Sequence, residues 1–86
     1  MNKEWYVVNT YSGHENKVKE KLLMSASTMG LEDYIFRVVV PEEKVIDEKG
    51  KEKLKKIFPG YILVEMVMTD EAWFVVRNTP GVTGFI

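Results

Sequence analysis

The side chains that could do acid–base or metal chemistry are few and scattered. His14 is the only histidine and there is no cysteine, so disulfides and thiolate metal sites are excluded. Two acidic pairs, at residues 32–33 and 42–43, are typical of solvated connections, because a hard-cation site needs converging oxygen ligands. The glycines do not form a phosphate-cradling pattern. We therefore expect no enzyme, no metal site and no cofactor.

Lysines are the remaining candidates for chemistry, because they can contact phosphate. Lys53, Lys55 and Lys56 cluster in a charged stretch, and Lys17 and Lys21 lie one turn apart in a predicted helix. Each group fits either a solvated surface that resists aggregation or a phosphate contact. The formal net charge is −1, from 12 basic and 13 acidic residues, which argues against binding to nucleic acid mainly through bulk charge.

The longest apolar run, residues 58–68, organises the predicted fold. Pro59 and Gly60 introduce it, and side chains then alternate between the two faces of a strand. The positions predicted to face the core are Ile62, Val64, Met66 and Met68. Tyr61 and Leu63 fall on the opposite face, where grouped apolar side chains indicate a docking surface.

Strands and helices alternate around this run. Strands are predicted at residues 5–8, 35–40, 61–68 and 82–86, and helices from about residue 13 to 29 and from 70 to 77. Ser12 and Glu15 match a capping box at the start of the first helix, whose expected buried stripe is Val18, Leu22, Ala26 and Met29. Thr69 or Asp70 is expected to cap the second helix.

Residues 42–57 combine dense charge with few apolar side chains. Gly50 suits the turn of a hairpin in the middle of this stretch. The composition fits a solvated β-hairpin arm and a mobile loop equally well.

The order of elements predicts an α+β fold in residues 1–86, which are few enough for one domain. The expected architecture is a two-layer βαββαβ sandwich (split βαβ, RRM/ferredoxin-like), with a four-stranded antiparallel sheet, both helices on one face and a charged β-hairpin arm. Trp5, Val7, Tyr61 and Leu63 then share the open sheet face, provided that the first and third strands are neighbours. Without an apolar segment suited to a signal peptide or a membrane span, we expect a soluble intracellular protein.

The aromatic open face supports more than one function. RRM domains stack RNA bases on aromatic side chains of the central strands. The match to their motif is poor here, because Ile62 takes the small position and Leu63 and Met66 take aromatic ones. A helix laid in a groove fits this apolar face better. The same face would also suit self-association, or burial under the arm or under a further domain.

Five segments of the chain together resemble the N-terminal domain of the NusG family of bacterial transcription factors. They are residues 5–8 (WYVV), 11–18 (YSGHENKV), 40–43 (VPEE), 58–64 (FPGYILV) and 78–85 (NTPGVTGF). The basic arm and the NTPGV form are most similar to the Gram-positive members. Family members carry a linker and a C-terminal KOW domain, so the resemblance implies an excised N-terminal (NGN) domain that lacks the KOW domain.

The resemblance implies a monomeric, cytoplasmic module of transcription elongation and antitermination, without cofactor or membrane association. It implies that the apolar sheet face binds the clamp helices of the RNA polymerase β′ subunit and tunes pausing and processivity. The polymerase-binding positions that it implies are Trp5, Val7, Phe58, Pro59, Tyr61 and Leu63. It also implies that the segment of Asn78, Thr79 and Pro80 faces non-template DNA, and that Lys17 faces upstream DNA.

Overall fold

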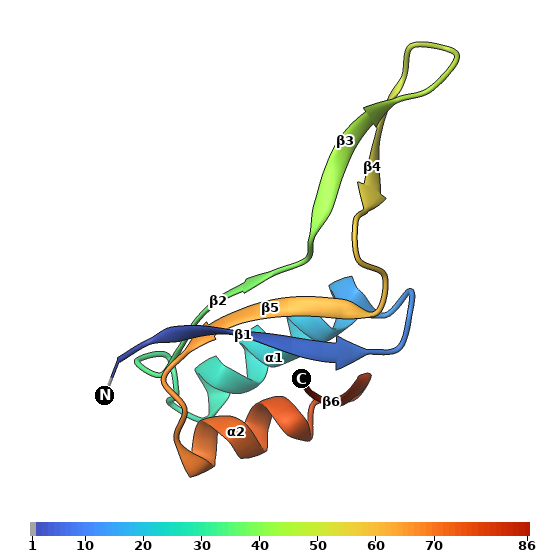
Figure 1. Ribbon diagram of the computed structural model, residues 1–86. Coiled ribbons are helices and arrows are strands. Elements are labelled where there is room, and N and C mark those ends of the chain that lie inside the picture. Colours follow the sequence, from blue (N-terminus) through green and yellow to red (C-terminus); the bar gives the residue numbers. More distant parts are fainter. Residues whose placement is uncertain (1) are drawn as a thin grey trace.

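The computed structural model describes residues 2–86 and shows two helices packed under a sheet from which an arm projects (Figure 1). The elements in chain order are β1 (Glu4–Thr10), α1 (Glu15–Thr28), β2 (Ile35–Val39), β3 (Glu42–Ile46), β4 (Glu52–Lys56), β5 (Tyr61–Met66), α2 (Asp70–Arg77) and β6 (Val82–Phe85). The predicted α+β sandwich is confirmed.

Strand β5 lies at the centre of the antiparallel sheet, whose order is β2-β5-β1-β6. Its neighbour β1 pairs Val7 with Leu63 and Asn9 with Tyr61, so the predicted contact between the first and third sheet strands is confirmed. The inward side chains of β5, Ile62, Val64 and Met66, are fully buried. Both helices cover that face, and the opposite face stays open (Figure 1).

The buried face of α1 matches the predicted stripe except at the last position. Val18, Leu22 and Ala26 are buried, but Met29 is 59% exposed. Helix α1 ends at Thr28, and Gly30 adopts a φ of +70° directly after the C-cap residue Met29. The last predicted core position therefore lies beyond the regular helix, which makes that part of the prediction wrong.

The two helices begin differently. In α2 the predicted cap is confirmed, because the Thr69 hydroxyl accepts a hydrogen bond from the Ala72 N–H at 3.1 Å. The predicted capping box of Ser12 and Glu15 is wrong: α1 begins after His14, and its N-cap makes no side-chain hydrogen bond within residues 2–86. The Glu15 carboxylate is buried and accepts a hydrogen bond from the Gly60 N–H, 45 residues away.

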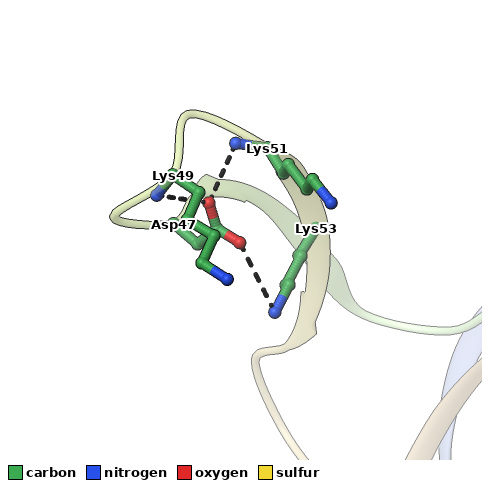
Figure 2. Close-up of polar contacts among 4 residues, drawn as sticks. All are labelled: Asp47, Lys49, Lys51 and Lys53. Carbon is green, nitrogen blue, oxygen red and sulfur yellow. Dashed lines mark hydrogen bonds and ion pairs between the residues drawn. The ribbon is translucent and has the colours of Figure 1, made fainter.

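The charged stretch forms a hairpin arm, in which β3 pairs with β4. Asp47 closes its tip by accepting hydrogen bonds at 2.9 Å from the backbone N–H groups of Lys49 and Lys51, and its other oxygen lies 3.5 Å from the Lys53 ammonium (Figure 2). Gly50 adopts a φ of +77° in this turn. The arm extends the long dimension of the molecule, which measures 47 Å against 23 and 22 Å (Figure 1).

Neither α1 nor α2 has the length and apolarity that crossing a membrane would require.

Candidate functional site

An apolar pocket of about 310 Å³ lies where the open sheet face meets the base of the arm. Val7 enters it from β1 and Tyr61 and Leu63 from β5, while Pro41 and Phe58 enter from the two ends of the arm. None of these five lining residues is charged. Because the residues come from three separate parts of the chain, sheet pairing and the position of the arm together create the pocket.

Three of the five pocket residues are exposed to solvent. Phe58 is 59% exposed, and Tyr61 and Val7 are each 37% exposed. The arm projects away from the sheet instead of folding over its open face (Figure 1). A contiguous exposed apolar patch of this kind is a candidate interaction surface.

A tight turn at Gly60 sets the position of Phe58 and Tyr61 in the pocket. The Gly60 N–H donates to Glu15 Oε2 at 2.8 Å, and the Gly60 carbonyl accepts from the Thr10 N–H at 2.8 Å. Gly60 has a φ of +83°, and a Cβ there would lie 3.3 Å from the Thr10 carbonyl oxygen. The turn therefore requires glycine, and it is tied to the first residue of α1.

The surroundings of the Glu15 carboxyl group favour its ionised form. Burial raises the pKa of Glu15, but the hydrogen bond from the Gly60 N–H and the charge of Lys56 outweigh burial, so the pKa lies below its usual value. The Lys56 ammonium lies 3.9 Å from Oε1, which has no hydrogen-bond partner among residues 2–86. The carboxylate thus links α1 to both the turn and the base of the arm.

Replacing Glu15 with glutamine should lower stability at neutral pH and reduce the pH dependence of stability. A carboxyl group whose pKa is depressed on folding stabilises the folded state above its unfolded pKa, and this contribution is lost as the pH falls through the folded pKa. We expect Glu15→Gln to cost about 1 kcal/mol at neutral pH, since a neutral acceptor replaces a charged one. The measurement is the urea concentration at the midpoint of unfolding, taken at a series of pH values from about pH 5 down through the usual Glu pKa of about 4.3. As the pH decreases, this midpoint should fall less steeply for the variant than for the wild type. Parallel curves would contradict this role.

The end of the open face away from the arm is polar. The Arg37 Nε donates to Glu65 Oε1 at 2.9 Å, and the guanidinium carbon lies 5.0 Å from the centre of the Trp5 ring. Glu65 is only 7% exposed, although it lies on the outward side of β5. The hydrogen bond from Arg37 lowers the pKa of Glu65 and keeps this carboxyl group charged.

The structure groups four of the six predicted polymerase-binding residues in the apolar pocket, namely Val7, Phe58, Tyr61 and Leu63. Pro59 is exposed in the adjoining turn, and Trp5 lies outside the pocket beside Arg37. Pro41 was not among the predicted binding positions, although it belongs to the segment of residues 40–43 that carries the family resemblance. It also missed Arg37, for which the only available signal was the outward acidic position 65 in an otherwise apolar strand.

The residues predicted to face DNA differ in exposure. Asn78, Pro80 and Lys17 are exposed, and the Asn78 amide donates to the Phe74 carbonyl at 2.8 Å. Thr79 is 4% exposed, and its hydroxyl donates to the Val75 carbonyl at 2.7 Å. The Thr79 hydroxyl therefore completes the end of α2, and its side chain is not at the surface of this loop.

Several known proteins are similar to this chain in sequence and in fold. The family described as "Transcription termination factor nusG" matches residues 3–86. A transcription termination/antitermination protein NusG from Bacillus subtilis is 65% identical over 89 residues, which cover all of this chain and 50% of that protein. The corresponding protein from Staphylococcus aureus is 60% identical over 87 residues, covering 98% of this chain and 48% of the relative. The chain thus spans about half the length of these relatives.

Solved structures of NusG proteins have the same fold as this chain. A NusG from Thermotoga maritima, studied for its domain interaction, matches with a TM-score of 0.83 and 41% identity, covering all of this chain and 46% of that one. The N-terminal NusG domain (NGN) of Methanocaldococcus jannaschii has a TM-score of 0.64 at 17% identity, covering 96% of this chain and 84% of that one. The second match concerns the fold alone.

Proposed function

The chain belongs to the NusG family of transcription factors, which are not enzymes, and on this basis we propose that it is an NGN domain that docks on RNA polymerase. The proposed partner is the pair of clamp helices of the β′ subunit, and the proposed result is altered pausing and processivity during elongation in the cytoplasm. The observation that carries this proposal is the exposed apolar pocket of Val7, Pro41, Phe58, Tyr61 and Leu63.

The shape and chemistry of the pocket favour a helical partner over a nucleic acid. Its lining has no cation to meet a phosphate, and Tyr61 is its only residue with a polar side-chain atom. A helix that inserts apolar side chains into such a groove gains about 25 cal/mol per Å² of buried apolar surface, before the cost of association. The domain is proposed to bind as a monomer.

Titration with an isolated β′ clamp-helix fragment tests the proposal. Intrinsic tryptophan fluorescence should change on binding, because Trp5 lies 45% exposed on the same sheet face. Binding of single-stranded RNA in place of the fragment would support an RRM-like function. Concentration-dependent self-association without fragment binding would support a self-association surface. Either result would reject the proposed docking function.

A second part of the proposal concerns DNA. The loop that follows α2 presents Asn78 and Pro80, and the next residue, Gly81, packs against α1 at Val18, one position after the exposed Lys17. We propose that Asn78 contacts the non-template strand and that Lys17 contacts a phosphate of upstream DNA. Thr79 is left out of this contact set because its hydroxyl is buried.

Replacing Asn78 with alanine should alter sequence-dependent pausing. Loss of one base contact costs about 1 kcal/mol of discrimination, which corresponds to about a fivefold change in the ratio of pause lifetimes between two non-template sequences. In vitro transcription on templates that differ only in the bubble region measures this ratio. Affinity for the clamp-helix fragment serves as the control and should not change. Equal pausing ratios for variant and wild type would remove Asn78 from the DNA contact.

A further inference from the structure

A row of three side chains crosses the open sheet face beyond the apolar pocket. Trp5 on β1 pairs with Glu65 on β5, and Glu65 pairs with Arg37 on β2. All three lie on the face that the helices leave uncovered, the same face as Val7 and Leu63. The proposed docking surface therefore continues from the pocket into a charged end.

Arg37 is held in place while most of its donors stay available. Its Nε donates to Glu65, and its guanidinium lies over the Trp5 ring, yet its side chain is 66% exposed. Among residues 2–86 the side chain makes no other hydrogen bond or ion pair. A guanidinium has five N–H donors, so four remain for a ligand. Because two contacts already orient the planar group, binding a ligand costs little further ordering.

Several charged side chains lie at this end of the face. Lys3 lies beside the cluster, with its ammonium 5.0 Å from the centre of the Phe36 ring. Lys3 and Arg37 supply two positive charges here, and two carboxylates lie nearby, that of Glu65 and that of Asp33, which lines a pocket together with Lys3 and Phe36. Glu65 is almost fully buried and already bonded to Arg37. The exposed N–H donors of Arg37 therefore favour an acidic group on a partner that docks here.

We propose that Arg37 is a specificity-determining contact that takes an aspartate or glutamate carboxylate from the helical partner docked in the adjoining pocket. This inference rests on the proposed function and adds the chemistry of the partner at one end of the interface. Arginine and carboxylate form paired, charge-assisted hydrogen bonds of defined geometry. A peptide carboxylate fits better than a nucleobase, because Arg37 already occupies a face of the Trp5 ring on which a base would stack.

A double variant, Arg37→Gln with Glu65→Gln, tests the inference without leaving a buried carboxylate unpaired. Its affinity for the clamp-helix fragment should fall about tenfold, and the dependence of affinity on salt concentration should weaken. Replacing each Asp and Glu of the fragment with its amide, one at a time, should identify one position. That change should cost the wild type about tenfold in affinity and the double variant almost nothing, which defines a coupled pair.

Four outcomes would overturn the inference. If the double variant binds the fragment as tightly as the wild type while Tyr61→Ala binds weakly, the docking function stands and the Arg37 contact fails. If no acidic position of the fragment couples to Arg37, the contact also fails. If the wild type does not bind the fragment, or if the double variant loses RNA binding instead, both the inference and the proposed function fail.

A second variant, Lys3→Gln, breaks no hydrogen bond and should lower affinity about twofold by reducing the local charge.

Discussion

Tyr61→Ala should weaken binding to the β′ clamp-helix fragment about 30-fold, as expected when a buried aromatic anchor worth about 2 kcal/mol is lost. Tyr61 lines the centre of the proposed docking surface, with Val7 and Leu63 beside it and Phe58 at the base of the arm. Its ring is 37% exposed in the free chain, so docking can bury further area of a rigid side chain. Isothermal titration calorimetry measures the change in affinity.

Stability should change little in Tyr61→Ala. The hydrogen bond from the Tyr61 N–H to the Phe58 carbonyl involves backbone atoms only, and the core side of β5 stays intact. We expect a loss of less than about 1 kcal/mol in the free energy of unfolding. Tyr11→Ala is the matched control: Tyr11 is exposed, lies outside the pocket and contacts His14 ahead of α1. Equal affinities for Tyr61→Ala and Tyr11→Ala would reject the docking surface.

Gly81→Ala should destabilise the fold by about 3 kcal/mol, from backbone strain and from overpacking together. Gly81 has a φ of +98°, and a Cβ there would lie 2.6 Å from Cγ2 of Val18. Val18 is fully buried in the core and cannot move aside without disturbing its neighbours. For a domain of this size the loss corresponds to a drop in Tm of roughly 15 °C, which differential scanning calorimetry detects easily.

Gly30→Ala separates the two causes. Gly30 also has a positive φ, +70°, but no atom lies within 4 Å of a Cβ built there. Its replacement should cost only the backbone strain, about 1 kcal/mol. If Gly81→Ala and Gly30→Ala are equally destabilised, the contact between Gly81 and Val18 does not hold the loop after α2 against α1.

Local patterns were sufficient to predict the architecture. The alternation of Ile62, Val64 and Met66 with Tyr61 and Leu63 predicted both the core side and the exposed side of β5. The ends of α2 were predicted to within a residue from the threonine before it and the proline after it. Such signals can be read directly from the chain, because strand period, helix caps and proline geometry depend only on residues a few positions apart. The pairing of β1 with β5 then followed from the order of elements, so the exposed apolar face was also predictable.

The partners of the buried polar side chains were decided by the tertiary structure. Glu15 matched a local capping motif, yet its carboxylate bonds to Gly60, 45 positions away. Arg37 and Glu65, 28 positions apart, meet only because β2 and β5 pair. The family resemblance placed Thr79 in the segment expected to face DNA, but its hydroxyl is buried against the last turn of α2. Most buried polar groups are hydrogen-bonded, and which partner each one finds depends on the groups that folding brings beside it. Residue type and spacing therefore determined the elements and their faces, whereas burial determined the polar contacts.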